Sequence, residues 1–428
     1  MKIGIDCRSM LNLRGGELAG VGHYTYYLVK NLLKIDQENQ YVLFVDHKFS
    51  SESDFANDNC KIVKFPFYEY KKYLPVAYSQ MLITSFLNRE KLDLFHSPAN
   101  IVPLFYSRPS VVTIHDLAIY RFPEFFPRSF LSRQAFSTKI LVPKTLIKAK
   151  KIIAVSKNTK KDIIENFGIP EDKINVVYEG FDSAGKNLAV GANFKNVSDK
   201  YGIGDKYFLF VGTIEPRKNL IRLIHAFRNL MMVYDSPARG CQLILAGNRG
   251  WYDEEVFESI ATANASILAK DNRRSGKERR RGLDIRPEES RQKDGERRKD
   301  VERRKNDPIK YIGYITDEEK FALMANAVSF VFPSLYEGFG LPILEAMSVG
   351  TPVITSNGSS LCELADSSCG HLVDPSSEAD IANAMQTVLT DEGHCESCKK
   401  VCLQKTEQFS WEKCANETLE VYMAALKK

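Results

Sequence analysis

The chain has 428 residues, of which 44% are hydrophobic and 26% charged, with a formal net charge of +5. This length exceeds what one hydrophobic core usually supports, so we expect two domains. The sequence offers no run of about 20 uncharged apolar residues and no apolar core of a signal peptide near its start, which argues against membrane-spanning and secreted classes of protein.

The first half of the chain alternates short apolar runs with amphipathic stretches. The runs expected as strands are 2–7, 41–46, 61–65, 92–96, 110–114, 151–156 and 174–177. The stretches expected as helices are 23–35, 74–89, 129–148 and 157–167. Such alternation predicts a doubly wound, mainly parallel sheet, and ligands of these sheets bind beyond the carboxyl ends of the strands.

Two features follow strands in this half. Gly20 and Gly22 lie in a glycine-rich loop after the first strand. Glycines there permit a close approach to a phosphate, although an ordinary tight turn has the same pattern. His115 directly follows the strand at 110–114, where a histidine is either a hydrogen-bonded packing residue or a ligand contact, and Asp116 beside it could simply cap a turn.

The second half begins after residues 186–205, which are rich in small and polar residues and are predicted as a linker. A strand at 207–211 runs into the sequence GTIEPRKN, which contains Arg217 and Lys218. Two adjacent cations at a strand-to-helix turn could hold a diphosphate, because Arg binds two oxygens at once and Lys supplies a point charge. An exposed basic pair at a turn is the ordinary alternative.

A charged insert interrupts this half at 270–307. Residues 270–310 contain 17 Lys and Arg against 10 Asp and Glu, a balance of +7, so the rest of the chain carries −2. With almost no large apolar residues the insert cannot form a core, and we expect it to be disordered or a marginal helix. It is either a solvated segment or one attracted to anionic lipid headgroups or to nucleic acid, and its interspersed acids favour the first. We expect no nucleic-acid partner.

The most informative stretch is 328–357, where a buried strand, a turn with two glycines, a helix and another strand follow one another. Gly338 and Gly340 let backbone N–H groups at the helix N-terminus approach an anion. Phosphate repels carboxylates, so Glu337 and Glu345 are expected to bind neutral hydroxyls of a sugar or ribose. Two solvated carboxylates on a helix are the ordinary alternative.

Nine cysteines at irregular spacing are typical of a reducing compartment, so we expect a cytoplasmic protein, with peripheral membrane contact left open. Cys395, Cys398 and Cys402 have a spacing that resembles metal ligands, but it also places them on one helix face. Without a second cysteine pair we interpret them as core residues and expect no metal site.

The residues 337–347 read EGFGLPILEAM and resemble the E-x7-E signature of the retaining glycosyltransferases of family 4, also called glycosyl transferases group 1. The resemblance extends to GVG at 20–22, HD at 115–116, GTIEPRKN at 212–219 and FSWE at 409–412. It therefore covers nearly the whole chain apart from the insert.

The resemblance implies roles for single residues. Glu337 would contact the donor sugar and Glu345 the ribose, while Arg217 and Lys218 would hold the diphosphate. His115 would point toward the donor sugar. The glycine-rich turns would contact the nucleotide-sugar through Gly20, Gly22, Gly338, Phe339, Gly340 and Leu341.

The family fold is GT-B, an α/β architecture of two Rossmann-like, doubly wound domains that face a central cleft. On this basis we expect an acceptor-binding domain at 1–185, a linker at 186–205 and a nucleotide-sugar-binding domain at 206–408. A helix at 409–428 would cross back to the first domain.

The implied activity is metal-independent, anomer-retaining hexosyl transfer in cell-surface polysaccharide synthesis, without a cofactor. The GTIEPRKN variant resembles mannosyltransferases of O-antigen assembly most, which favours GDP-mannose as donor and a glycan or polyprenyl-linked oligosaccharide as acceptor. A UDP-hexose donor is the rival. A GT-B epimerase or a non-catalytic GT-B protein is the alternative from another class, although the latter is expected to have lost Glu337, Arg217 or Lys218.

Overall fold

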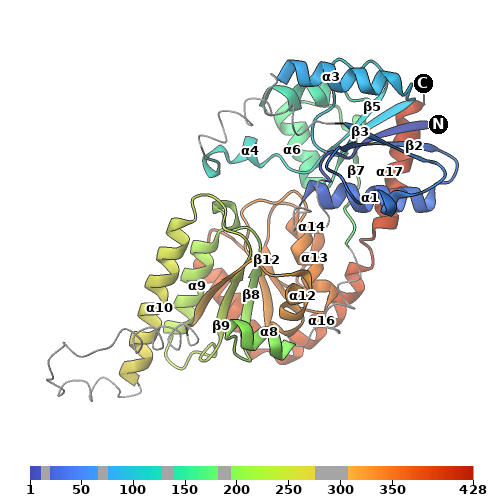
Figure 1. Cartoon of the computed structure of the whole chain (residues 1–428). Coiled ribbons are helices and arrows are strands. Elements are labelled where there is room, and N and C mark those ends of the chain that lie inside the picture. Colours follow the sequence, from blue (N-terminus) through green and yellow to red (C-terminus); the bar gives the residue numbers. More distant parts are fainter. Residues whose placement is uncertain (11–19, 66–75, 128–138, 182–193, 275–306, 428) are drawn as a thin grey trace, which may run out of the picture. The chain divides into compact units, whose positions relative to one another are not determined.

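The computed structural model describes residues 1–10, 20–65, 76–127, 139–181, 194–274 and 307–427. The chain forms two compact units, each built on its own parallel sheet (Figure 1). Unit 1 comprises Met1–Asp182 and Gln408–Lys428, and unit 2 comprises Ser183–Glu407.

Unit 1 contains a seven-stranded parallel sheet in the order β3-β2-β1-β4-β5-β6-β7. Each apolar run predicted in this half is confirmed as a strand, with its ends shifted by at most about two residues. The strands are β1 (Lys2–Asp6), β2 (Gln40–Asp46), β3 (Cys60–Phe65), β4 (Leu94–Ser97), β5 (Ser110–Ile114), β6 (Lys151–Ala154) and β7 (Ile174–Val176).

Alternation along the strands gives this sheet two apolar faces. On β2, Tyr41 and Leu43 join the core beneath one face, whereas Val42 and Phe44 join a separate core on the other. The helices of the unit are α1 (Val21–Ile35), α3 (Val76–Arg89), α4 (Ala118–Arg121), α6 (Lys157–Phe167) and α17 (Trp411–Leu426), with 3-10 turns η1 (Glu52–Phe55), η2 (Pro123–Phe125) and η3 (Glu171–Lys173). Residues 139–148 are also helical.

The last helix, α17, packs against α1 within unit 1. Its N-cap Ser410 accepts a hydrogen bond from the Lys413 N–H. Trp411 is 4% exposed and its ring stacks on that of Tyr27 at a centroid distance of 5.5 Å. The FSWE sequence therefore supplies both the start of this helix and its first core residue.

Unit 2 contains a six-stranded parallel sheet in the order β10-β9-β8-β11-β12-β13. The strands are β8 (Tyr207–Val211), β9 (Gln242–Ala246), β10 (Ile309–Gly313), β11 (Ser329–Phe332), β12 (Val353–Ser356) and β13 (Gly370–Val373). The order reverses direction at β8 and β11, which are neighbours although they lie far apart in the sequence. The segments that follow these two strands therefore meet at one edge of the sheet.

In unit 2, α9 and α10 lie on one side of the sheet, and α12 and α13 lie on the other (Figure 1). The helices are α8 (Phe194–Tyr201), α9 (Leu220–Met232), α10 (Glu254–Arg274), α12 (Asp317–Asn326), α13 (Leu341–Ser348), α14 (Leu361–Leu364), α15 (Glu378–Thr390) and α16 (Glu392–Thr406), with the 3-10 turn η4 (Pro216–Lys218). The capping box expected before α12 is present between Thr316 and Glu319.

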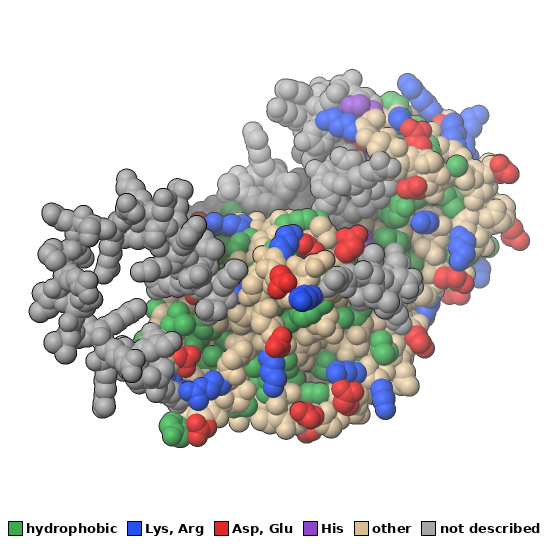
Figure 2. Space-filling view, turned by 60° about the horizontal axis from the view of Figure 1, so that its bottom comes forward, with side chains coloured by type: hydrophobic (Ala, Val, Ile, Leu, Met, Phe, Trp, Pro, Cys, Tyr) green, Lys and Arg blue, Asp and Glu red, His purple; other side chains and the backbone are tan. Residues whose placement is uncertain are grey.

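The structure differs from the sequence interpretation in two connecting segments. A helix, α8, lies within the stretch predicted as linker at 186–205, because Val197 is buried and Phe194 stacks on Tyr207. The helix α10 continues through Arg274, past the predicted start of the insert at residue 270. The remainder of the insert lies outside the described residues. Figure 2 shows acidic and basic side chains mixed across the face that it presents, in keeping with the small net charge outside the insert.

Candidate active site

The turns after β8 and β11 bring three of the predicted site residues into contact. η4 presents Arg217 and Lys218 beside the segment that carries Glu337. Lys218 Nζ lies 2.6 Å from Glu337 Oε1, and Arg217 Nη1 lies 3.1 Å from Glu337 Oε2. Backbone contacts join the same turns, because the Leu335 N–H donates to the Arg217 carbonyl oxygen over 2.9 Å. The adjacency of β8 and β11 thus assembles a compact charged cluster.

Glu337 is held as a carboxylate in this cluster. Its side chain is 10% exposed, and the Ser334 hydroxyl adds a hydrogen bond of 2.6 Å to Oε1. Burial alone would raise the pKa of Glu337, but Arg217, Lys218 and Ser334 together lower it below its ordinary value. Burial lowers the pKa of Lys218, and the carboxylate of Glu337 opposes that shift.

A second carboxylate, Glu215, completes the cluster and was not singled out from the sequence. Its Oε1 lies 2.7 Å from Arg217 Nη2, and its residue is 4% exposed. Arg217 also donates from Nη1 to the Tyr336 carbonyl oxygen over 3.0 Å. The guanidinium is therefore oriented by partners from both turns, which fixes it more firmly than a surface basic pair.

Serine hydroxyls support the backbone of the turn after β11. Ser359 Oγ donates to the Glu337 carbonyl oxygen over 2.7 Å and accepts from the Glu337 N–H over 2.8 Å. Ser360 Oγ contacts the carbonyl oxygens of Glu337 and Phe339 at 2.9 and 2.7 Å. Both serines come from the segment after β12, so the turn is shaped by the neighbouring strand connection.

The fold of unit 2 requires a glycine at position 340, independently of any ligand. It is the N-cap of α13 with a φ of 117°, and a Cβ there would lie 2.8 Å from Leu361 Cδ2. Leu341 begins the helix and Phe339 is 5% exposed. The sequence interpretation explained the glycines by phosphate approach alone, whereas packing against α14 is a separate reason at position 340.

Glu345, the predicted ribose contact, lies on α13 and is paired with a lysine that the sequence did not reveal. Lys320 Nζ on α12 lies 2.8 Å from Glu345 Oε1 and 2.9 Å from Asp317 Oδ1. Burial lowers the pKa of Lys320, but the two carboxylates outweigh it and raise the pKa above its ordinary value. The ammonium of Lys320 therefore orients the carboxylate of Glu345.

Replacing Lys320 by methionine is expected to lower the free energy of unfolding by about 1–3 kcal/mol, because the carboxylate of Glu345 loses its partner in a mostly buried setting. Chemical denaturation measures the change. The control is Lys399→Met, whose pair with Glu396 is exposed at 48% and 68% and should contribute less than about 1 kcal/mol. Equal shifts in both variants would contradict the buried role of Lys320.

In unit 1 the predicted site residues are Gly20 and Gly22 at the start of α1 and His115 after β5. Gly20 is the N-cap of α1 with a φ of 64°, and Gly22 lies inside α1, so the helix begins two residues earlier than predicted. The ring of Tyr24, also on α1, meets the His115 ring edge-on at a centroid distance of 4.7 Å. Asp116 caps a turn, as the alternative interpretation allowed, by accepting a hydrogen bond from the Ala118 N–H.

The face of α16 that carries Cys395, Cys398 and Cys402 packs into the core of unit 2. Cys398 and Cys402 are 1% and 0% exposed, and Cys395 donates its thiol to the Val388 carbonyl oxygen. Across the described residues, no group of three or more His, Cys, Asp or Glu side chains is arranged to hold a metal ion. Within the same residues, no helix combines the length and the hydrophobicity that a bilayer crossing needs.

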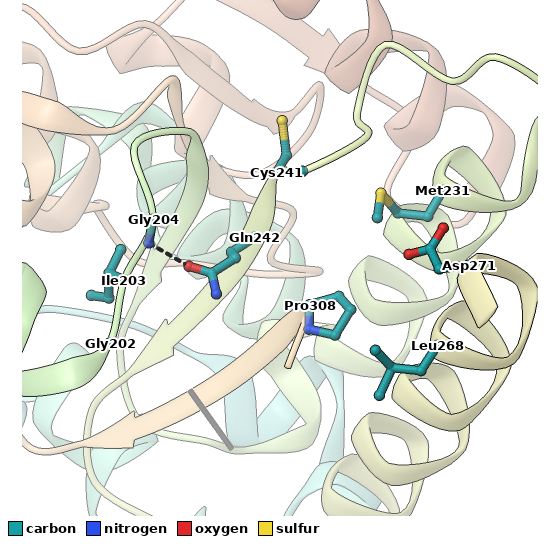
Figure 3. Close-up of a pocket in the computed structure, with 10 residues that line it drawn as sticks. Gly202, Ile203, Gly204, Met231, Cys241, Gln242, Leu268, Asp271 and Pro308 are labelled. Atoms are coloured by element: carbon teal, nitrogen blue, oxygen red, sulfur yellow. Dashed lines mark hydrogen bonds between the residues drawn. The ribbon is translucent and has the colours of Figure 1, made fainter. Parts of the chain in front are cut away.

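A pocket of about 380 Å³ lies in unit 2 at the amino-terminal ends of β9 and β10 (Figure 3). The charged cluster, in contrast, follows the carboxyl ends of β8 and β11. Gln242 at the start of β9 and Pro308 just before β10 contribute to its wall, and Asp271 is the single charged residue of the lining. None of the predicted site residues is among the ten that line it. The pocket therefore does not belong to the candidate active site.

Two family models match the chain: Glycosyltransferase Family 4 over residues 18–184 and Glycosyl transferases group 1 over residues 286–402. The O-antigen chain mannosyltransferase B of Escherichia coli is 30% identical over 417 residues, which cover 95% of this chain and 96% of that protein.

Solved structures share the fold at low sequence identity. Anabaena HepE in complex with UDP and glucose gives a TM-score of 0.66 at 17% identity and covers 99% of this chain and 100% of its own. WaaG, a glycosyltransferase involved in lipopolysaccharide biosynthesis, gives 0.65 at 13% identity, with 98% and 99% covered. With two doubly wound units and these matches, the chain is a GT-B glycosyltransferase and belongs to glycosyltransferase family 4, the glycosyl transferases group 1.

Proposed function

We propose that this chain transfers mannose from GDP-mannose to a glycan or polyprenyl-linked oligosaccharide in O-antigen-type polysaccharide synthesis, with retention of the anomeric configuration and without a metal. The observation that carries the proposal is the cluster of Arg217, Lys218 and Glu337, because it joins two cations for a diphosphate to a carboxylate for sugar hydroxyls. The similarity to an O-antigen mannosyltransferase over 95% of the chain supports mannose as the sugar.

The proposed chemistry uses the cations of the cluster. An ammonium carries three donors and a guanidinium five, so Lys218 and Arg217 can bind Glu337 and phosphate oxygens together. In the proposed step the bond from the sugar C1 to the phosphate oxygen breaks and a bond from C1 to the acceptor oxygen forms on the same face. The acceptor proton passes to the leaving phosphate, whose negative charge the two cations stabilise.

A donor panel tests this proposal. Purified protein is incubated with GDP-mannose, UDP-glucose or UDP-galactose and a polyprenyl-linked oligosaccharide, with and without EDTA. We expect nucleotide release and glycan extension with GDP-mannose alone, at an unchanged rate in EDTA, and an α-linked product by NMR. Glu337→Gln should be inactive, whereas Glu378→Gln, which alters a surface pair with His225, should behave as the unmodified protein.

Other outcomes would contradict the proposal in distinct ways. Turnover of a UDP-hexose alone would replace the donor. Isomerised sugar released without an acceptor would indicate an epimerase, and absence of turnover with every donor would favour a non-catalytic GT-B protein. Loss of activity in EDTA would overturn metal independence.

A further inference from the structure

Both ring nitrogens of His115 face oxygen atoms within unit 1. Nδ1 lies 3.0 Å from Glu179 Oε1, and Nε2 lies 2.8 Å from the Pro98 carbonyl oxygen. A carboxylate and a carbonyl oxygen are both acceptors, so both contacts are hydrogen bonds only when both nitrogens carry a proton. The side chains of His115 and Glu179 are 12% and 7% exposed, which leaves the ring dependent on these two partners.

The proton belongs on the ring and not on the carboxyl group. An imidazole has an ordinary pKa of about 6.5 and a glutamate of about 4.3. Burial lowers the pKa of His115, but Glu179, the Pro98 carbonyl and the charge of Asp116 outweigh it, so the pKa is raised. The ring is therefore an imidazolium over a wider pH range than a free histidine.

Three other titratable groups near this pair, all among the described residues, are neutral. His96 on β4 bonds to Tyr422 and Thr113, and burial together with the charge of His115 lowers the pKa of His96 to about 3. Burial raises the pKa of Tyr24 on α1 and of Cys414 on α17, the latter further raised by Glu179. Among the described residues, Glu179 and Asp116 supply the charges that raise the pKa of His115.

The pair joins three connections at the carboxyl edge of the first sheet. Pro98 follows β4, His115 follows β5 and Glu179 lies beyond the end of β7. The His115 N–H also donates to the Asn100 side chain over 3.0 Å. Loops at this edge carry ligands in doubly wound sheets. Holding these three loops in place would therefore shape the ligand-binding edge of unit 1.

We propose that Glu179 is a positioning residue of this glycosyltransferase, which with His115 forms a charged clasp that fixes three loops at the carboxyl edge of the first sheet. His115 then serves as a fixed cation and not as a carrier of protons. The link to catalysis rests on the proposed role of this edge in the transfer reaction, whereas the protonation state does not depend on it.

NMR of protein labelled with ¹⁵N-histidine tests the protonation state directly. We expect both His115 nitrogens to be protonated at pH 7 and the ring to lose its proton at a higher pH than the ordinary 6.5 of a histidine. The contribution of the clasp to stability is then complete below pH 6.5 and fades as the pH rises through the raised pKa of His115. A bare Nδ1 at pH 7, with the proton on Glu179 or absent, would overturn the proposal.

Glu179→Gln tests the consequence for activity. Glutamine can accept one N–H but has no charge, so the pKa of His115 should fall and one of its two hydrogen bonds should be lost at pH 8. We expect kcat/KM to fall about tenfold at pH 8, the usual cost of one lost hydrogen bond of a charged group, and to recover at pH 6. The control is Glu378→Gln, which neutralises the glutamate of a half-buried His–Glu pair at 2.9 Å in unit 2 and should leave the pH profile unchanged.

The outcomes separate this proposal from the donor assignment. The activity measurement uses whichever nucleotide-sugar is turned over, and the NMR measurement uses none. A Glu179→Gln variant with an unchanged pH profile, or with activity lost equally at pH 6 and pH 8, would contradict the clasp even where mannosyl transfer is observed.

Discussion

Replacement of Lys218 by methionine is expected to lower kcat by about 10²–10³-fold, the usual effect of removing one group that stabilises charge on a leaving atom in a buried site. The methionine keeps the aliphatic part of the side chain and removes the charge. Lys218 is 8% exposed, so water cannot readily replace its ammonium. Initial rates at saturating donor measure the loss.

The same substitution also affects folding, and a second variant separates the two effects. Glu337 would keep Arg217 and Ser334 but lose its 2.6 Å contact with the ammonium. Breaking a buried ion pair on one side costs about 3–5 kcal/mol, whereas removing both charges costs much less. Lys218→Met combined with Glu337→Gln should therefore regain stability while activity stays low. A double variant that recovers both would show that the single variant fails through misfolding.

The positions of most strands and helices could be predicted from the sequence alone. Apolar runs bounded by turn residues located the seven strands of unit 1, because the inner strands are buried on both faces and read as continuous hydrophobic segments. The outermost strands β3 and β7 are only partly buried, but they are also short apolar runs. The helix α8 was missed because it is only 8 residues long and polar overall, with one buried residue, Val197. The predicted place of Arg217 and Lys218 in a strand-to-helix turn is confirmed, because both lie in η4 between β8 and α9.

The ion-pair partners of His115 and Glu345 could not be predicted from the sequence. Glu179 is 64 residues from His115, and Lys320 is 25 residues from Glu345. Their pairing depends on which strands are neighbours in the sheet, and no local pattern encodes that. Ser359 and Ser360 appear as ordinary turn residues for the same reason. The proposed roles in donor binding stay predictions until ligands are tested.

Gly180, near the end of the first chain segment of unit 1, packs against the start of the C-terminal helix α17. Its replacement by alanine should be among the most destabilising changes in this unit. A Cβ at Gly180 would lie 2.2 Å from the Trp411 backbone nitrogen and 2.6 Å from the Ser410 carbonyl carbon. These are backbone atoms at the start of α17, next to the bridge between Phe181 and Ser410, so they cannot rotate away.

We expect Gly180→Ala to cost about 3 kcal/mol or more, at the upper end of overpacking, since α17 must shift and disturb its contact with α1. Hydrogen exchange should become faster in α1 and α17, while amides of the unit 2 sheet keep their protection. Gly168→Ala is the matched control: Gly168 has a φ of 61° and open space around it, so alanine there adds only backbone strain of about 1–2 kcal/mol. The C-terminal helix α17 supplies Trp411 and Tyr422 to the core of unit 1, so disturbing it should weaken this core. Equal rates of amide hydrogen exchange in the two variants would contradict this prediction.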